Sequence, residues 1–568
     1  MPETSSYYQP GLTLPDLLNR AVINHPELFI GYFDKNGSLM IQTYEELRIK
    51  AKMIAAGLFN LGLKPGDKMI IATQYNQETI ELLWGSFLLG VVPTILQPPM
   101  TFSGYNPSVV KLMNVYEQLN SPFIFMSTEV KGSGDLPEDK VKHIKELDCN
   151  GAYPDPILKP DDLAFIQFSS GSTGDPKGIM LTHGNLMVNM DAIRIGLDLH
   201  YPDNIGNWMP LFHDMGLIGY HLTPLYSIAF QYQIETIDFI MNPVLWINMM
   251  SEQKITVTGC TNFGLALVLR YFNRKKPVFD WNLSSVKAML NGAEPISVKI
   301  MQDFVETLKK FGFRPEAMMP VYGMAEATLA ISFSPLMKPS VVTVFDTSML
   351  DQENMAQPVE YAESSARLLS EVGVALNDVE IRIVDDNDLP LVNGIAGHIQ
   401  LKGSGITKGY YKNTGATAAA FCGKWLRTGD IGFFFEGRLY ISGRYKDIIF
   451  KNGRNYFAND LESMACNLND INYGKVCFGG TTSSETGQDK VIAFVAGLQE
   501  AKALETFREL RALLRSNLGI TVDEMVLIKS NEIPKTSSGK LQRFKLMQRY
   551  INREFNDRRI SADNLDNQ

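Results

Sequence analysis

The sequence predicts an α/β protein with a large N-terminal domain of strand–helix layers, a small β-rich subdomain and a small α+β C-terminal domain. Its 568 residues exceed what one hydrophobic core usually organises. Helical patterns alternate with short apolar strands in the first part, whereas short strands with Gly and Asp turns dominate from about Val379. We therefore place the large domain at residues 1–443, its β-rich part at about 375–443, and the small domain at 444–568.

The alternation of helices and strands is clearest early in the chain. Thr43–Leu61 has the pattern of an amphipathic helix, and Thr43 and Glu46 have the spacing of a capping box. Such a helix between apolar strands favours a largely parallel sheet covered by helices. The predicted elements that follow are, in order, a strand (Lys68–Thr73), a helix (Glu78–Leu89) and a strand (Val91–Leu96).

Composition and charge exclude several classes of protein. The 53 basic and 62 acidic residues give a formal net charge of −9, so no basic balance favours nucleic acid. Met1–Pro10 lacks the basic start and apolar run of a signal peptide, and glycines and prolines interrupt the uncharged stretch Leu82–Val110. We therefore expect a cytoplasmic protein without a membrane span. The scattered cysteines, which fit neither a disulfide framework nor a zinc site, are Cys149, Cys260, Cys422, Cys466 and Cys477.

The strongest local signal is the segment Phe168–Gly178, FSSGSTGDPKG, between apolar strands predicted at Leu163–Phe168 and Ile179–Leu181. Its glycines let the backbone turn tightly and present N–H groups to an anion, and Lys177 adds a positive charge. The segment predicts a loop that wraps a triphosphate, although the same residue types also form solvated hairpin turns. It is not a Walker loop, because no Gly-Lys-Ser/Thr opens a helix after it. The candidate phosphate-binding residues are Ser169, Ser170, Gly171, Ser172, Thr173, Gly174 and Lys177.

Three later segments carry weaker signals. Arg427–Gly432, RTGDIG, places Asp430 on a tight turn, where a carboxylate accepts the hydroxyl protons of a ribose. Gly443–Asn455 begins with a Gly-Arg pair, and Pro534–Arg543 places Lys540 in a glycine-containing loop that brings an ammonium group to a phosphate. Each segment alone is typical of ordinary turns, so their order along the chain matters more than any one of them.

In this order, and over essentially the whole chain, the four segments resemble the motifs of the adenylate-forming superfamily. That superfamily includes acyl-CoA synthetases, peptide-synthetase adenylation domains, firefly-type luciferases and fatty acyl-AMP ligases. Trp208–Gly219, Asn291–Ile296 and Tyr322–Thr328 are most similar to the fatty acyl-AMP ligase branch. The stretch between Ser332 and about Val374 also lies where that branch carries an insertion, which is thought to restrict the domain motion needed to use coenzyme A.

The resemblance implies a reaction in two steps. ATP and a fatty acid give acyl-AMP and pyrophosphate, with Mg²⁺ bridging the phosphates. The acyl group then passes to the phosphopantetheine arm of an acyl carrier protein that is a separate chain. The small domain is implied to rotate between the steps about a hinge near Lys446. A monomer is expected.

The resemblance also implies roles for individual residues. Lys540 would contact the substrate carboxylate and the α-phosphate, His213 would line the acyl side, and Glu326 with Thr173 would bind Mg²⁺. Asp430 and Arg444 would fix the ribose. The residues implied to frame the adenine, or to lie beside it in the nucleotide site, are Gly292, Ala293, Glu294, Tyr322 and Gly323.

Several alternatives stay open at the level of sequence. Glu326 also fits a helix-capping carboxylate, and His213 a buried structural histidine. For the whole protein the alternatives are an acyl-CoA synthetase that uses free coenzyme A and a catalytically inactive scaffold. A peptide-synthetase adenylation domain is disfavoured, because no Phe-Asp segment stands at Phe212–Asp214 to supply a carboxylate for an amino-acid ammonium. Intact Lys540, Asp430 and Glu326 argue against the scaffold.

The sequence departs from the superfamily's usual pattern at three places. His398 stands where Glu is usual in Gly-Glu-Ile, and Asn413–Gly415 replaces an Asn-Arg-Pro-like turn. Thr261–Phe263 lacks the Ala-Pro that often precedes Asn-Phe in the ligases. None of the three coincides with a predicted phosphate or ribose position, so they bear on the branch more than on the chemistry.

Overall fold

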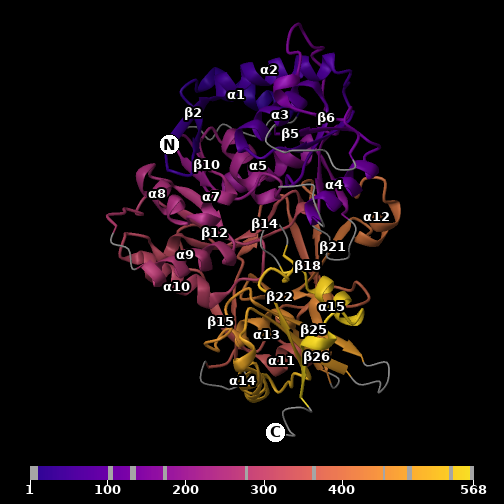
Figure 1. The fold of residues 1–568 in the computed structure, drawn as a ribbon. Coiled ribbons are helices and arrows are strands. Elements are labelled where there is room, and N and C mark those ends of the chain that lie inside the picture. Colours follow the sequence, from indigo (N-terminus) through magenta and orange to yellow (C-terminus); the bar gives the residue numbers. More distant parts are fainter. Residues whose placement is uncertain are drawn as a thin grey trace.

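The computed structural model of the chain describes residues 11–99, 106–127, 136–169, 176–275, 279–360, 366–451, 454–482, 489–535 and 541–562. A larger upper part contains the N-terminal helices and strands, and a smaller lower part contains the last helices (Figure 1). The predicted α/β class, with a large N-terminal and a smaller C-terminal domain, is confirmed.

A nine-stranded sheet forms the centre of the large domain, in the order β17-β14-β13-β12-β11-β9-β10-β1-β2. The six strands from β13 to β1 in this order pair in parallel, whereas β2, β14 and β17 pair antiparallel at the edges. Parallel strands need helical crossovers, which cover the faces of the sheet. The strands are β1 (Phe29–Phe33), β2 (Leu39–Thr43), β9 (Asn204–Asn207), β10 (Phe230–Ile234), β11 (Val257–Cys260), β12 (Ala288–Asn291), β13 (Met318–Gly323), β14 (Ala330–Phe333) and β17 (Val374–Ala375).

A second, wholly parallel sheet has the order β4-β3-β5-β6, as the early strand–helix alternation predicts. The capping box of α2 is present: the Thr43 hydroxyl accepts the Glu46 N–H at 3.1 Å, and the Glu46 carboxylate accepts the Thr43 N–H at 2.7 Å. The elements are α1 (Leu14–Asn24), α2 (Tyr44–Asn60), β3 (Lys68–Ala72), α3 (Asn76–Leu89), β4 (Val92–Ile95), α4 (Pro107–Gln118), β5 (Phe123–Met126) and β6 (Val141–Lys142).

A two-stranded hairpin carries the predicted phosphate loop between the sheets. Its strands, β7 (Leu163–Phe168) and β8 (Gly178–Thr182), lie where the sequence predicts them and pair antiparallel. The helices that follow are α5 (His183–Gly196), the π-helix η2 (Met215–Leu222), α6 (Thr223–Tyr226), α7 (Thr236–Met241), α8 (Val244–Glu252), α9 (Asn262–Lys275) and α10 (Val298–Lys309).

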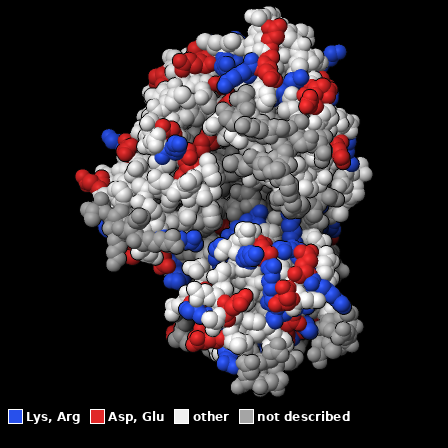
Figure 2. Space-filling model, viewed as in Figure 1, with Lys and Arg blue, Asp and Glu red and all other residues white. Residues whose placement is uncertain are grey.

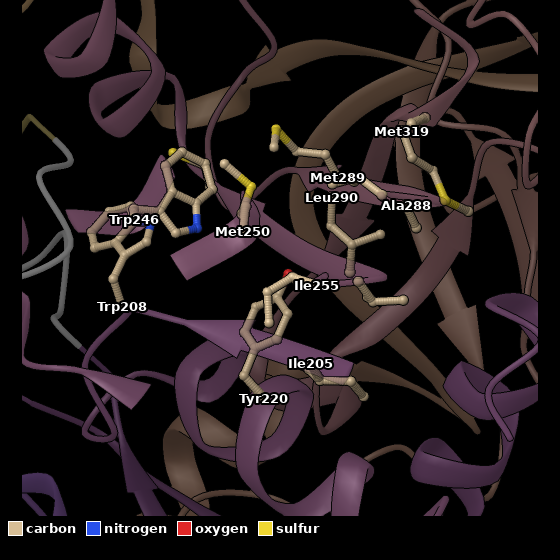
Figure 3. Packing of buried hydrophobic residues seen from close by; sticks show 14 of the residues in the cluster. Ile205, Trp208, Tyr220, Trp246, Met250, Ile255, Ala288, Met289, Leu290 and Met319 are labelled. Atoms are coloured by element: carbon tan, nitrogen blue, oxygen red, sulfur yellow. The ribbon is translucent and has the colours of Figure 1, made fainter. Parts of the chain in front are cut away.

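The largest hydrophobic core packs around the nine-stranded sheet (Figure 3). Trp246 is fully buried there, and its indole N–H donates to the Thr258 hydroxyl at 2.9 Å. The Trp208 ring stacks on Phe239 with their centroids 3.8 Å apart. The sequence alone does not place Trp246; the structure shows it as a core residue.

The segment between Ser332 and Val374 forms a separate hairpin of β15 (Val342–Asp346) and β16 (Ala366–Ser370), with α11 (Thr347–Gln352) following β15. The next elements form an antiparallel sheet, in the part of the chain where the Gly and Asp turns predict a β-rich subdomain. These are β18 (Glu380–Val384), β19 (Gly397–Lys402), α12 (Thr414–Ala420), β20 (Phe421–Cys422), β21 (Trp425–Phe435) and β22 (Arg438–Arg444).

The last part of the chain has two hydrophobic clusters of its own, consistent with an independent unit. The exact boundary at 443/444 stays a prediction. No helix in the described ranges is long and apolar enough to cross a membrane. The elements are β23 (Ile448–Lys451), β24 (Arg454–Phe457), α13 (Ala458–Ala465), β25 (Val476–Thr482), β26 (Asp489–Ala496), α14 (Glu500–Leu518), β27 (Glu524–Ile528), α15 (Arg543–Ile551) and β28 (Arg559–Ser561).

Replacing Trp246 by Ala should destabilise the large domain, because the change removes a fully buried indole and leaves a cavity beside the sheet. The expected loss in the free energy of unfolding is about 3–5 kcal/mol. Chemical denaturation followed by circular dichroism measures it. Ile157→Ala is the control, since that side chain is 93% exposed and its loss should change stability by less than about 0.5 kcal/mol. Equal effects of the two variants would contradict the assignment of Trp246 to the core.

Candidate active site

A cavity of about 1700 Å³ lies between the large and small domains. Figure 2 shows the hollow between the upper and lower parts of the molecule, with Lys and Arg side chains along its lower rim. The segments that follow β9, β11, β12 and β13 all contribute to its wall. Ligand sites in open α/β sheets lie at the carboxyl ends of the strands, and this cavity has that position. The predicted site residues that line it are Ser169, Lys177, His213, Ala293, Glu294, Tyr322, Gly323, Glu326, Asp430, Arg444 and Lys446.

The two residues that flank the predicted phosphate loop, Ser169 and Lys177, form the neck of the loop and are hydrogen-bonded to each other. The backbone N–H of Ser169 donates to the Lys177 carbonyl at 3.0 Å, and the Lys177 N–H donates to the Ser169 hydroxyl at 3.4 Å. The Lys177 ammonium lies 5.1 Å from the centre of the Tyr410 ring. Ser170, Gly171, Ser172, Thr173 and Gly174 lie outside the described residues, so their predicted roles stay predictions.

Asp430 is buried where β21 and β22 pair, and its two carboxylate oxygens have different partners. The Tyr322 hydroxyl donates to one oxygen at 2.6 Å, and the Arg444 Nε donates to the other at 3.2 Å. The negative charge of Asp430 raises the pKa of Arg444. Burial, followed by the Asp430 charge, raises the pKa of Tyr322, so this hydroxyl stays a donor. The structure therefore brings together three residues that the sequence predicts for the nucleotide site.

The backbone around the predicted adenine position is tightly constrained. A Cβ on Gly292 would lie 2.7 Å from the Val321 Cγ2, and one on Gly323 would lie 2.1 Å from the Leu329 carbonyl oxygen. Ala293 between them in sequence has a φ of 69°, in the left-handed region that favours glycine. Gly292 does not itself line the cavity, whereas Ala293 and Gly323 do. Both glycines are thus required by packing, and their contact with a nucleotide remains a prediction.

Glu326 lies in a short 3-10 turn after β13 and is largely buried. One carboxylate oxygen accepts the Tyr410 hydroxyl at 3.0 Å, and the Glu326 carbonyl accepts the Thr407 N–H at 2.8 Å. Burial raises the pKa of the Glu326 carboxyl. The Tyr410 ring also faces Lys177, so one tyrosine connects the phosphate loop with this carboxylate. Glu326 lines the cavity, and the N-cap of its short 3-10 turn is Met324; its role at the site stays a prediction.

His213 has a neighbour that the sequence analysis leaves out of the catalytic set. Its Nδ1 lies 2.7 Å from an Asp214 oxygen, and both side chains are mostly buried. Asp214 also accepts the Met215 N–H at 2.7 Å at the start of the π-helix η2. The Met215 N–H also donates to the His213 Nδ1, at 3.3 Å, so one backbone group contacts both side chains. In the sequence, the pair is indicated only by the adjacent residues Phe212, His213 and Asp214 of the Trp208–Gly219 motif.

An apolar part of the cavity wall begins beside His213. It comes from α5, from η2 and from β12, β13 and β14 of the nine-stranded sheet. Figure 3 shows Tyr220 and Leu290 of this wall among the side chains of the main core. The wall fits an apolar ligand next to the polar nucleotide region. Its residues are Ile193, Gly219, Tyr220, Leu290, Val321, Leu329, Ala330 and Phe333.

The small domain contacts the predicted adenine segment directly. The Tyr473 hydroxyl lies 3.5 Å from one Glu294 oxygen, while the other Glu294 oxygen accepts the Phe263 N–H at 3.0 Å. The Lys535 ammonium lies 5.8 Å from the centre of the Phe263 ring. Lys446 is exposed and lines the cavity. Lys540 lies outside the described residues.

A buried arginine joins the β15–β16 hairpin to the small domain. Arg367 pairs with Asp351 of α11 at 3.2 Å and with Asp460 of α13 at 2.9 Å, and it packs over the Phe457 ring. Burial raises the pKa of Asp351 to about 7 and that of Asp460 to about 6. Figure 1 shows β15 and α11 in the lower part with α13 and α14. The sequence analysis places an insertion here but does not identify these ion pairs.

Comparison with known proteins gives concordant matches. The family pattern of the AMP-binding enzymes matches residues 40–411. A putative acyl-CoA synthetase of Caulobacter vibrioides is 30% identical over 90% of this chain and 91% of its own length. A medium-chain-fatty-acid–[acyl-carrier-protein] ligase of Moorena producens is 28% identical over 90% of each chain. A solved structure from work on fatty acyl-adenylate ligases of E. coli and L. pneumophila has a TM-score of 0.88 at 28% identity, and the match covers 96% of this chain and 99% of that one.

Replacing Arg367 by Met should loosen the contact between the hairpin and the small domain in a pH-dependent way. The raised pKa values of Asp351 and Asp460 mean that burial disfavours their ionised forms, and Arg367 offsets that cost. The variant should therefore lose about 3–5 kcal/mol at pH 8, where the carboxyls must ionise without a partner. At pH 5, where the folded protein can keep them protonated, the loss should be smaller.

Thermal unfolding at the two pH values measures the difference. Arg48→Met is the matched control, because Arg48 forms a partly exposed pair with Glu45 on α2 and should contribute less than about 1 kcal/mol at either pH. A loss that is the same at pH 5 and pH 8 would rule out the charge argument.

Proposed function

The chain belongs to the AMP-binding enzyme family, and on that premise we propose that it joins a fatty acid to AMP and passes the acyl group to an acyl carrier protein. The observation that carries the proposal is the cavity itself. It combines the neck of the phosphate loop, the Tyr322–Asp430–Arg444 cluster and an apolar wall beginning at His213. A nucleotide and an acyl chain are the two ligands that such a combination fits.

The polar part of the cavity supports a nucleotide role. Asp430 keeps lone pairs beyond those used by Tyr322 and Arg444, so it is able to accept the hydroxyl protons of a ribose. Ala293 and Glu294 would lie beside the adenine. Lys177 and the phosphate loop would hold the β- and γ-phosphates, whose charge suits backbone N–H groups and an ammonium.

The residues present also fit a magnesium ion. Glu326 offers a carboxylate oxygen that is not used by Tyr410, and carboxylates are ligands that Mg²⁺ prefers. Glu326 and Thr173 would hold the ion. When bound, Mg²⁺ supplies positive charge against the phosphates of ATP.

In the reaction that we propose, the protein positions the acid and ATP and forms no covalent bond to either. A carboxylate oxygen of the acid attacks the α-phosphorus of ATP, the bond to the bridging oxygen breaks, and pyrophosphate leaves with the electron pair. The apolar wall holds the acyl chain, and His213, oriented by Asp214, lines the path to the carboxylate. Lys540 would lie between the carboxylate and the α-phosphate and offset the charge that develops there.

The acyl acceptor is the finer part of the proposal. The buried pairs of Arg367 join the inserted hairpin to the small domain, which supports restricted domain motion and hence a carrier protein in place of free coenzyme A. The relative from Moorena producens is named for transfer to an acyl carrier protein. The relative from Caulobacter vibrioides is named a putative acyl-CoA synthetase, so coenzyme A is the alternative acceptor.

One assay separates these functions. The purified protein is incubated with ATP, Mg²⁺ and a radiolabelled C12 fatty acid, either alone, with coenzyme A, or with a phosphopantetheinylated carrier protein. Acyl-AMP that persists with coenzyme A and is consumed by the carrier supports the full proposal. Acyl-CoA as the main product moves the second step to coenzyme A, and no acyl-AMP under any condition favours an inactive scaffold.

Replacing Lys540 by Ala should lower the rate of adenylation by about 10²–10³-fold, because the charge that develops between carboxylate and α-phosphate loses its cation. ATP binding should stay close to that of the unchanged protein. Pyrophosphate release measures the first quantity, and calorimetric titration with ATP measures the second. Lys529→Ala, at an exposed lysine of the small domain, is the control. Near-normal pyrophosphate release from the Lys540 variant would refute the role.

A further inference from the structure

Helix α4 touches the phosphate loop at both of its ends. The Lys111 ammonium donates to the carbonyl of Phe168, the last residue before the loop, at 3.5 Å. About two turns further along the helix, the Gln118 side chain donates to the carbonyl of Pro176, near the end of the loop, at 3.2 Å. Helix α4 therefore contacts the residues on either side of the loop, and Lys111 lines the cavity beside Phe168.

Lys111 has no acidic partner among the residues that the structure describes. Its single hydrogen bond there is to the neutral Phe168 carbonyl. Burial and, to a smaller degree, the positive charge of Lys545 on α15 in the small domain lower the pKa of Lys111 to about 8. Burying an ammonium beside another cation is costly unless an anion joins them. Lys111 also shares the cavity wall with Ser169 and Lys177, which are at the two ends of the loop.

We propose that Lys111 is a further polyphosphate-binding residue, whose ammonium binds the β- and γ-phosphates of ATP and the pyrophosphate that forms from them. This inference rests on the proposed function and names a residue that the sequence motifs do not include. Its position in the cavity wall with Ser169 and Lys177, the residues that flank the predicted phosphate loop, matches the outer phosphates and not the α-phosphate, which must lie toward the apolar wall to meet the acid. The positive charges of Lys111 and Lys545 repel each other. A polyphosphate bound between them would offset this repulsion, so it would favour closure of the small domain over the cavity.

The test compares ATP with AMP, because AMP lacks the phosphates that Lys111 would bind. Lys111→Gln removes the charge but keeps a donor for the Phe168 carbonyl, and Lys111→Arg keeps the charge. Calorimetric titration of the Gln variant should give a Kd for ATP at least about tenfold higher, with the Kd for AMP within about twofold of the unchanged protein. The Arg variant should recover most of the ATP affinity. Lys52→Met, at an exposed lysine of α2, should change neither value.

A kinetic measurement adds a second readout. In the reverse reaction, from acyl-AMP and pyrophosphate to ATP, the Gln variant should have a raised KM for pyrophosphate and an unchanged KM for acyl-AMP. AMP binding also reports folding, since a variant that binds AMP normally has an intact site.

The outcomes distinguish the two proposals. If the unchanged protein binds neither ATP nor AMP, the proposed function fails. If the unchanged protein binds both and the Gln variant binds ATP equally well, the role of Lys111 fails while the function stands. A parallel loss of ATP and AMP affinity in both the Gln and Arg variants would make Lys111 a structural support of the loop and overturn the inference.

Discussion

The parallel register of β9, β11, β12 and β13 is the constraint on which the rest of the site depends. β11 pairs in parallel with both β9 and β12, and β12 pairs in parallel with β13, so all four strands end at one edge of the sheet. The segments after them supply His213, Phe263, Glu294 and Glu326 to one cavity wall. These residues are far apart in sequence, so only the pairing of the strands brings them together. A change of register in any of these strands would move its functional residue away from the others.

Two groups of charged residues on the cavity wall differ in what they can bind. At the phosphate loop, Lys111 and Lys177 bring positive charge without a carboxylate partner among the described residues. At the opposite side, Asp430 offers acceptors, and its own charge is balanced by Arg444. The phosphates of a nucleotide are anionic and pair with cations, whereas the hydroxyl groups of its ribose donate hydrogen bonds to acceptors. The first group therefore suits the phosphates of the proposed nucleotide, and the second suits its ribose.

Local signals in the sequence predicted local structure well. The capping box of α2 and the strands β7 and β8 are present because turn residues and apolar runs determine them within a few residues. The features that the sequence did not predict depend on distant partners. Arg367 meets Asp460 from another domain, and Trp246 meets Thr258 behind the sheet, so neither contact has a signal in its own segment. The predicted roles of the phosphate loop and of Lys540 remain predictions.

The three departures from the superfamily pattern have structural explanations that leave the nucleotide region intact. Asn413 caps α12 by accepting the Ala416 N–H, so this turn is held by a cap in place of a proline. Asn262 donates to the Pro295 carbonyl at 2.7 Å, and this bond ties the segment after β11 to the segment that carries Glu294. His398 pairs with Asp386 and its ring lies 4.9 Å from that of Tyr445, next to the predicted hinge. His398 therefore contacts the segment that contains the predicted hinge, and neither of these two contacts is with Tyr322, Asp430 or Arg444.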